Sequence, residues 1–254
     1  MVFRRPMRLS GFSLVELAVV FFIIALLLGT AMYTLSAQTD QRNFEETRRR
    51  LEGARELLLA FAVANGRLPC PGTASGDENP LGGGNCASPW GGFLPARTIG
   101  FQTVDANGFA LDAWQNRIRY AVSSNAIALV GCTGPSTQPH FTSAVNLRTN
   151  GITCQPGDLV VCSRAPTPVT ANVCDAGTSV TNQNTVVAIV FSTGKNGALG
   201  GGALNEARNL DNNRLFVTRT PDPASAAGGE FDDQLVWIPV GELYGKLIAA
   251  GRLP

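Results

Sequence analysis

One carboxylate lies near the start of a long apolar stretch, where its charge could serve a specific chemical purpose. From Phe12 to Leu35 the only ionisable side chains are those of Glu16 and Tyr33. About 20 apolar residues in a helix are enough to cross the hydrocarbon core of a bilayer. A carboxylate within that core costs about 2.5–3.5 kcal/mol, which makes it a candidate functional residue. We therefore predict a membrane-spanning helix and a cationic partner for Glu16.

The residues before this stretch are basic and end in a glycine. They contain three arginines and no acid, and Gly11 is followed directly by Phe12. Together with Glu16, they resemble the leader and cleavage site of type IV prepilins and of the related pseudopilins of type II secretion. In that family a prepilin peptidase cuts after the glycine and methylates the new amino terminus, and the fifth mature residue is usually glutamate. The resemblance covers about residues 8–28 and implies a cut between Gly11 and Phe12, N-methylation of Phe12, and Glu16 as the assembly residue.

The spacing of Phe12 and Glu16 explains how an assembly residue could act. After cleavage, the cationic amine of Phe12 and the carboxylate of Glu16 would be four residues apart on one helix. In a filament of staggered subunits, the amine of one subunit can meet the carboxylate of another. An ion pair removed from water gains far more Coulomb energy than an exposed pair, and an unpaired buried charge is costly. We expect Glu16 to set the register of an open, helical assembly.

Two ordinary export signals remain open as alternatives. A secretory signal has an apolar core of about 7–15 residues and a cleavage site of small residues. The stretch here is longer, but Ser36 and Ala37 follow it and would permit such a cut. The second alternative is a plain signal anchor in which Glu16 has no role. The joint positions of the glycine, the phenylalanine and the glutamate favour the prepilin interpretation.

The distribution of basic residues predicts the orientation in the membrane. Three arginines precede the apolar stretch, and the next basic residue is Arg42. The positive-inside rule therefore keeps the N-terminus in the cytoplasm and sends the rest of the chain across the inner membrane. We expect a single-pass protein with a periplasmic head, which becomes extracellular if the filament extends from the cell.

Six cysteines are consistent with an oxidising compartment. Six cysteines allow fifteen pairings, and the sequence alone does not choose among them. Short loop closures favour two pairs and leave a third: Cys70–Cys86, Cys162–Cys174 and Cys132–Cys154. A zinc site is the competing use, but the chain has no Cys-x-x-Cys pair and its only histidine is His140. We predict disulfides and no zinc.

Charge and composition argue against nucleic acid as a partner. Without the leader arginines, 17 Lys and Arg stand against 19 Asp and Glu, so the mature chain is slightly acidic. The run Arg48-Arg49-Arg50 is accompanied by Glu45, Glu46 and Glu52, and we interpret it as a solvated helix face. The 28 glycines and 15 prolines lie almost entirely after residue 64, which indicates strands and loops.

The chain is predicted to have four parts. Residues 1–11 form the leader, 12–35 the membrane and assembly half of one long helix, 36–65 its amphipathic half, and 66–254 the head. One face of the amphipathic half repeats at steps of three and four: Phe44, Thr47, Leu51, Ala54, Leu58, Phe61 and Asn65. Gly66 gives the helix a C-terminal stop.

The head is predicted to be an antiparallel β-sheet that packs on this helix. Patterns of β-branched and aromatic residues indicate six strands: 117–122, 126–130, 159–162, 186–191, 215–218 and 235–238. A short helix over 240–250 would close the chain, and 71–95 and 131–157 would be long loops held by disulfides. Strands and helices do not alternate, so we expect an α+β, pilin-like fold and not a doubly wound one.

Two head segments extend the resemblance to pseudopilins. Residues 111–120 are similar to a stretch with aspartate, tryptophan and asparagine in pseudopilin heads, although Gln115 stands where that family has glycine. Residues 192–197 and 231–237 resemble the family's late glycine loop and acidic segment, which in the major pseudopilins binds calcium through aspartates. Asp232 and Asp233 offer suitable oxygens, but Lys195 and Asn196 replace the expected acid. We therefore predict no cofactor; calcium, or an acidic turn that caps a strand, remain open for this segment.

Catalytic patterns are not recognisable in the sequence. Lys195 follows a glycine, but the other residues of a phosphate loop are missing, and His140 follows no nucleophile elbow. We predict that the chain is not an enzyme. The resemblance implies a structural subunit of a type IV pilus or a type II secretion pseudopilus, and the large irregular head favours a minor subunit. Its partners would be prepilin peptidase, other pilin or pseudopilin subunits, and an assembly platform in the inner membrane. A periplasmic binding or enzymatic domain on a prepilin-like anchor is the alternative.

Overall fold

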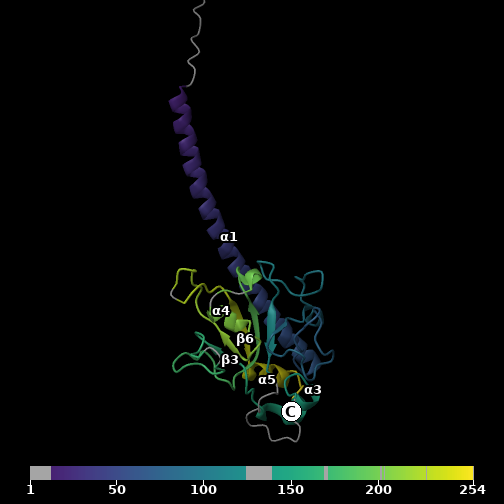
Figure 1. Cartoon of the computed structure of the whole chain (residues 1–254). Coiled ribbons are helices and arrows are strands. Elements are labelled where there is room, and N and C mark those ends of the chain that lie inside the picture. Colours follow the sequence, from purple (N-terminus) through teal and green to yellow (C-terminus); the bar gives the residue numbers. More distant parts are fainter. Residues whose placement is uncertain are drawn as a thin grey trace, which may run out of the picture. The chain divides into compact units, whose positions relative to one another are not determined.

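The computed structural model describes residues 13–123, 139–168, 171–200, 202, 204–226 and 228–253, with the backbone alone at 28, 30–37 and 199. The chain separates into two compact units, one that ends at Asn43 and one that begins at Phe44. Helix α1, Leu14–Asn65, belongs to both units (Figure 1).

The first unit consists of the N-terminal part of α1. The helix begins with a reciprocal cap: the Ser13 N–H donates to Glu16 Oε2 (2.9 Å), and the Glu16 N–H donates to Ser13 Oγ (3.2 Å). Large apolar side chains project from it into the surroundings, among them Leu14, which is 85% exposed, and Phe22, which is 69% exposed. Within the described residues, no helix combines the length and the apolar character needed to cross a bilayer. The span predicted for 12–35 includes residues outside that description and stays a prediction.

The second part of α1 forms one wall of the head. The middle of the predicted apolar face is confirmed, because Thr47, Leu51, Ala54 and Leu58 are all fully buried. At its ends, Phe44 and Phe61 are half-buried and Asn65 is exposed. The helix ends as predicted at Gly66, which has φ +71° and donates its N–H to the Ala62 carbonyl. Near the other end of the chain, Arg252 donates to the carbonyls of Val63 and Ala64 and satisfies two acceptors of the last helical turn.

The main sheet has four antiparallel strands in the order β1-β2-β4-β6. Their bounds are Gly92–Phe93, Arg119–Val122, Val186–Ser192 and Gln234–Pro239. Every residue of β4 is buried because both faces of the sheet are covered. Ala188 and Val190 face the core that includes α1, whereas Ile189 and Phe191 face a second apolar cluster.

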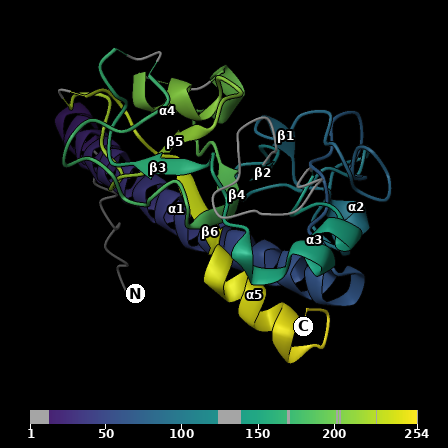
Figure 2. The same ribbon diagram turned by 90° about the horizontal axis from the view of Figure 1, so that it is seen from below.

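The prediction of a purely antiparallel head was wrong, because the head contains a second, smaller sheet that is parallel. Strands β3, Val160–Cys162, and β5, Leu215–Val217, were both predicted, but they pair in parallel and outside the main sheet. A parallel pair needs a long crossover, and here the crossover passes through β4 and α4. Figure 2 shows the resulting layers: α1 and α5, Val240–Ala249, on one side of the main sheet, and β3, β5 and α4 on the other.

Several short elements were missed because they are too short to show a periodic pattern. They are β1, which lies inside the predicted loop 71–95; α2, Ala96–Ile99; α3, Ala144–Asn150; the 3₁₀ turns η1, Gly151–Thr153, and η2, Gly197–Leu199; and α4, Leu204–Asn209. Helix α3 corrects the prediction of a continuous loop over 131–157, and its cap is Ser143, whose hydroxyl accepts the Asn146 N–H. The predicted strand 126–130 lies outside the described residues.

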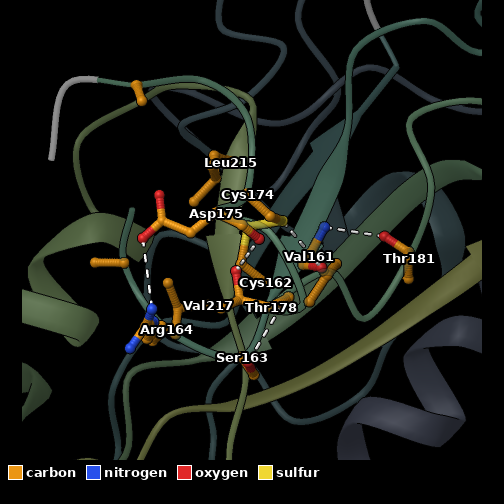
Figure 3. The surroundings of a disulfide bond; sticks show 12 residues. Val161, Cys162, Ser163, Arg164, Cys174, Asp175, Thr178, Thr181, Leu215 and Val217 are labelled. Atoms are coloured by element: carbon orange, nitrogen blue, oxygen red, sulfur yellow. Dashed lines mark hydrogen bonds and ion pairs between the residues drawn. A yellow bond between two sulfur atoms is a disulfide. The ribbon is translucent and has the colours of Figure 1, made fainter. Parts of the chain in front are cut away.

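Two of the predicted disulfides are confirmed, Cys70–Cys86 and Cys162–Cys174. Cys154 is also disulfide-bonded, but its predicted partner Cys132 lies outside the described residues. Figure 3 shows the Cys162–Cys174 bond at the end of β3, in a loop that the ion pair between Arg164 and Asp175 also joins.

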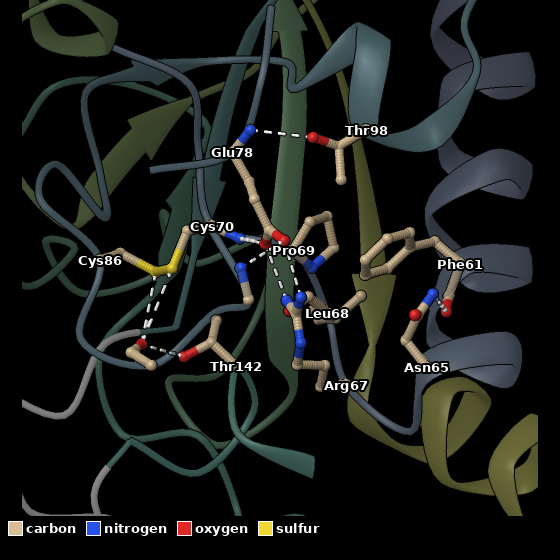
Figure 4. Close-up of polar contacts among 12 residues, drawn as sticks. Phe61, Asn65, Arg67, Leu68, Pro69, Cys70, Glu78, Cys86, Thr98 and Thr142 are labelled. Carbon is tan, nitrogen blue, oxygen red and sulfur yellow. Dashed lines mark hydrogen bonds and ion pairs between the residues drawn. A yellow bond between two sulfur atoms is a disulfide. The ribbon is translucent and has the colours of Figure 1, made fainter. Parts of the chain in front are cut away.

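The Cys70–Cys86 loop is organised by a buried ion pair. Arg67 binds Glu78 through two hydrogen bonds of 2.8 and 2.7 Å, and both residues are less than 10% exposed (Figure 4). The Glu78 carboxylate also accepts the backbone N–H groups of Cys70 and Gly82. Every oxygen of this carboxylate therefore has two donors.

Candidate functional site in the head: an acidic cluster behind a glycine loop

The sequence predicts functional residues at the N-terminus and in the head, and the structure describes only some of them. Gly11 and Phe12, the predicted cleavage and methylation site, lie outside the described residues. Glu16 is exposed in the first unit, where its carboxylate accepts the Ser13 N–H. The remaining candidates are in the head, and there the structure brings three separate segments together.

Asp112 joins the first two of these segments. Its Oδ1 accepts the N–H groups of Trp114 (2.9 Å) and Asn116 (2.8 Å), which closes a tight turn. Its Oδ2 accepts the Ser192 hydroxyl (2.6 Å) at the end of β4. Burial raises the pKa of the Asp112 carboxyl above its ordinary value. The two head segments singled out by resemblance, 111–120 and 192–197, are therefore in direct contact.

The turn after Asp112 has the shape expected for glycine although it carries glutamine. Gln115 has φ +69°, in the left-handed region that favours glycine. Gln115 therefore holds, with a side chain, a backbone conformation that glycine adopts without strain. Asn116 then donates from Nδ2 to the Gly194 carbonyl (2.6 Å), which fixes the start of the glycine loop.

The glycine loop leads to the third segment through backbone amides. Asp232 Oδ2 accepts the N–H groups of Lys195 (2.9 Å) and Asn196 (3.3 Å). Gly194 has φ +62°, and a Cβ there would meet the Asp232 carboxylate. The two residues that replace the expected acid therefore bind the aspartate with their main chain.

A third acid comes from helix α4, which the sequence did not reveal. Glu206 Oε1 accepts the Asp232 N–H (2.7 Å), and Oε2 accepts Asn196 Nδ2 and the Gly202 N–H (both 2.8 Å). Glu206 is fully buried although it belongs to a six-residue helix rich in polar residues. No periodic apolar pattern marks such a helix, so its inward-facing acid gave no sequence signal.

Glu206, Asp232 and Asp233 form what we call the acidic cluster. One carboxylate oxygen of each residue lies within 4.8 Å of the others, and all three residues are buried. Asp233 Oδ2 accepts Asn209 Nδ2 (2.6 Å). In the described part of the chain, Asp232 Oδ1 and Asp233 Oδ1 are buried without a hydrogen-bond partner. These oxygens leave two acceptors unsatisfied inside the head.

The pKa values of the two aspartates in the cluster are raised. Burial and the neighbouring charge of Glu206 raise the pKa of Asp232 to about 7. Burial also raises the pKa of Asp233 well above its ordinary value, against the opposing hydrogen bond from Asn209. The Asp232 and Asp233 carboxyls therefore hold a proton more readily than ordinary aspartates, and a bound cation would favour their charged forms.

The cluster suits a hard divalent cation. Calcium takes six to eight oxygen ligands, among them carboxylates and amide carbonyls. Glu206, Asp232 and Asp233 supply carboxylates, and Asn196 adds a buried Oδ1 that has no hydrogen-bond partner among the described residues. Such an ion would neutralise the cluster and hold the glycine loop against α4.

His140, the only histidine, has a structural environment. It is fully buried, and its Nε2 lies 3.0 Å from the Tyr244 hydroxyl, which in turn donates to the Cys154 carbonyl. Burial lowers the pKa of His140 to about 4, so the ring is neutral at pH 7. These contacts tie α5 to the segment around Cys154.

Comparison with known proteins adds no relative. No family model matches the sequence, and neither a curated protein nor a solved structure is significantly similar to it. The described part of the head is an α+β fold with an antiparallel main sheet and the disulfides Cys70–Cys86 and Cys162–Cys174.

Proposed function

We propose that this chain is a minor structural subunit of a type IV pilus or of a type II secretion pseudopilus. Prepilin peptidase would cut it between Gly11 and Phe12, and it would wait in the inner membrane with its N-terminus in the cytoplasm and its head in the periplasm. An assembly platform would then add it to a filament through its N-terminal helix.

The observation that carries this proposal is the exposed apolar surface of the first unit. Between Leu14 and Leu27 the large apolar side chains are 44–85% exposed. An apolar surface of this extent marks a contact with lipid or with other protein. Lipid would cover it while the subunit is stored, and the helices of other subunits would cover it in a filament.

The single acid on this surface supports a role in assembly. The Glu16 carboxylate accepts one backbone N–H, from Ser13, and a carboxylate can accept several more hydrogen bonds. The cut would place the new amine of Phe12 next to Ser13 in sequence. An amine from a neighbouring subunit could then bind Glu16 without disrupting the helix cap.

A chain that merely uses a prepilin-like anchor is the alternative, with the head as a periplasmic binding or enzymatic domain. The acidic cluster favours a binding role over a catalytic one, because its carboxylates are held by hydrogen bonds inside the head and are buried. Between a pilus and a secretion pseudopilus, the similarity of 111–120 and 192–197 to pseudopilin heads favours secretion.

The deciding experiment changes Glu16 and follows both processing and assembly. We expect Glu16→Val to be inserted and cut normally but to be absent from sheared filaments, because the register ion pair is lost. Glu56→Val is the matched control, since Glu56 lies on the same helix within the head and is exposed. Immunogold labelling of filaments and N-terminal sequencing of the membrane fraction give the two readouts.

Two results would reject the proposal. Normal incorporation of Glu16→Val would remove the register argument, and a mature N-terminus other than Phe12 would remove the prepilin assignment. A head that is abundant in the membrane but absent from all filaments would support the anchor alternative. A bulky residue in place of Gly11 should block processing altogether, which a gel-mobility assay detects.

A further inference from the structure

Helix α4 buries its polar side chains and exposes its only large apolar one. Leu204 is 59% exposed, whereas all the buried residues of the helix are polar or charged: Asn205, Glu206, Arg208 and Asn209. A helix of six residues is too short to be stable in isolation. Because no apolar residue of α4 is buried, hydrogen bonds from these four side chains decide where the helix lies.

Two of the four side chains bind the loop that the Cys162–Cys174 disulfide closes, which we call the disulfide loop. Asn205 Oδ1 accepts the Ala165 N–H (2.8 Å), in the arm that follows the first cysteine. Arg208 Nη2 donates to the Ala171 carbonyl (2.6 Å), in the arm that leads to the second cysteine. Both arms of the disulfide loop are therefore fastened to α4.

The other two side chains bind the acidic cluster or belong to it. Glu206 is one of its carboxylates and accepts the Asp232 N–H (2.7 Å), and Asn209 Nδ2 donates to Asp233 Oδ2 (2.6 Å). Each of them directly follows, in the sequence, a residue that binds the disulfide loop. The loop and the cluster are therefore fastened to neighbouring residues of one short helix.

A second connection between the two sites runs through β5. The Asn209 side chain donates to the Val217 carbonyl (3.0 Å) and accepts the Val217 N–H (2.7 Å). Val217 is the register partner of Cys162 in the parallel pair of β3 and β5 (Figure 3). Asn209 therefore contacts an aspartate of the cluster and also the strand that pairs with the first cysteine.

The cluster has buried groups that can accept a cation. Asp232 is 6% and Asp233 is 3% exposed, and each has one carboxylate oxygen without a hydrogen-bond partner in the described part of the chain. Asn196 adds an observation from outside the three acids: its Nδ2 donates to Glu206 Oε2 (2.8 Å), and its buried Oδ1 also has no partner among the described residues. Unsatisfied amide and carboxylate oxygens are suitable ligands for a hard cation such as calcium.

One sulfur of the disulfide can be reached from outside. Cys162 is fully buried, whereas Cys174 is partly exposed and lines a hollow of about 300 Å³ together with Ser179 and Thr181. A thiolate of an external dithiol would therefore attack Cys174 Sγ and displace the Cys162 thiolate, which takes up a proton. The second thiol of the reagent then closes the reagent's own disulfide and releases Cys174 as a thiol. Two electrons pass from the dithiol to the protein.

We propose that the Cys162–Cys174 disulfide controls how tightly the acidic cluster binds a divalent cation. The closed disulfide keeps the two arms of its loop together, and α4 then holds Glu206 beside the two aspartates. After reduction the arms gain conformational freedom, and ordering them around α4 takes up part of the free energy of cation binding. Such coupling is reciprocal, so a bound cation opposes reduction by the same factor. The inference rests on the candidate cation site and does not depend on the proposed filament function.

The first test measures the calcium affinity of the full chain in mild detergent by isothermal titration calorimetry. Replacing both Cys162→Ser and Cys174→Ser should lower the affinity by about tenfold, which is within the usual range of coupling between sites. The matched control replaces both Cys70→Ser and Cys86→Ser, because that loop makes no hydrogen bond to α4 among the described residues. The control should retain the affinity of the natural chain.

A second pair of variants tests whether α4 carries the coupling. Asn205→Ala combined with Arg208→Gln cuts both links to the disulfide loop and leaves the disulfide in place. This variant should also bind calcium less tightly, and removing the disulfide from it should have no further effect, because residues that act through one connection are not additive. Arg164→Gln is the control: Arg164 lies in the same loop but pairs with Asp175, and its loss should not change the affinity.

The reciprocal test uses the natural chain and reads reduction instead of binding. The protein is equilibrated with dithiothreitol buffers in calcium or in chelator, and the cysteines are then alkylated and quantified by mass spectrometry. Calcium should favour the closed Cys162–Cys174 disulfide by about tenfold, which is about 30 mV for a two-electron couple. It should not shift Cys70–Cys86, and Asp233→Asn should abolish the effect.

Four outcomes would overturn the proposal. They are equal calcium affinity with and without the Cys162–Cys174 disulfide, additive effects of the disulfide and the α4 variants, equal calcium shifts at both disulfides, and a natural chain that binds no calcium. The last outcome would leave the filament proposal intact, because that proposal rests on the first unit and Glu16. Thermal unfolding shows which variants are folded, and if the serine variant is not, the reduction equilibrium of the natural chain decides.

Discussion

Two of the places where the head buries charged groups are balanced very differently. In the Cys70–Cys86 loop, Glu78 has a bidentate arginine partner and two backbone donors. In the acidic cluster, three carboxylates lie together and two of their oxygens have no donor in the described part of the chain. The first arrangement is complete in itself and serves the fold. The second is incomplete without a proton or a cation, which is the property of a binding site.

The largest expected effect comes from breaking the complete arrangement. Arg67→Met leaves the Glu78 carboxylate buried without its cation, and such a change typically costs about 3–5 kcal/mol. Urea unfolding of the chain measures the loss. Arg97→Met removes an exposed pair with Asp77 and should change the free energy of unfolding by less than about 1 kcal/mol. A similar small value for Arg67→Met would mean that the buried pair is not needed for stability.

The incomplete arrangement should respond to calcium instead. A ligand that binds only the folded state at 100 times its Kd stabilises that state by about 2.7 kcal/mol. We expect calcium to raise the unfolding temperature of the natural chain relative to chelator, and to have no effect on Asp233→Asn. Asp77→Asn, a change at an exposed acid outside the cluster, serves as the control. Equal calcium effects in all three proteins would assign the stabilisation to other sites.

The same cluster should make stability depend on pH when no divalent cation is present. The folded-state pKa of Asp232 is raised to about 7 from an ordinary 3.8, so the folded state holds a proton that the unfolded state has lost. Its contribution to stability is therefore lost as the pH rises through about 7. In chelator, we expect the head to be more stable at pH 6.5 than at pH 8, and Asp232→Asn to flatten this difference.

Buried His140 acts in the opposite direction between about pH 6.5 and pH 4. Its pKa is lowered to about 4, so the unfolded state gains a proton first as the pH falls below about 6.5, which favours unfolding. This loss opposes the gain that Asp232 continues to give down to about pH 4, so the stability profile should flatten below pH 6.5 and should not keep rising. A stability profile that falls monotonically from pH 8 to pH 4 would contradict the role given to Asp232.

The smallest expected effect concerns the turn that connects the cluster to Asp112. Gln115 occupies a left-handed conformation that costs a residue other than glycine about 1–2 kcal/mol. Gln115→Gly should stabilise the head by roughly 0.5–1 kcal/mol, since the greater freedom of glycine in the unfolded chain offsets part of the gain. Gln115→Ala is the control and should not stabilise. Differential scanning calorimetry has the sensitivity for this comparison.

The predictable parts of the structure are those with a local signal. The buried face of α1 followed from helical spacing, and strands β2, β4 and β6 followed from β-branched and aromatic runs. The pairs Cys70–Cys86 and Cys162–Cys174 followed from short loop closure. Each of these features depends on residues that are close in sequence.

The remaining features depend on contacts between distant segments. The parallel pairing of β3 with β5 is set by how the chain crosses the sheet, and neither strand encodes that direction. Glu206 reaches Asp232 from a short helix 26 residues earlier in the chain. Asp232 and Asp233 were candidates from the sequence, but the acid that completes their cluster became visible only in three dimensions.

The contacts around the end of α1 have a mechanical consequence. Arg55 binds both the Trp237 carbonyl and Glu242, and Arg252 binds the carbonyls of Val63 and Ala64. The final strand and the final helix are therefore fastened to α1 at two levels. These side chains join the C-terminal half of α1 directly to β6 and to the segment after α5, so a force applied to this part of the helix would pass to the end of the chain without first crossing the intervening loops.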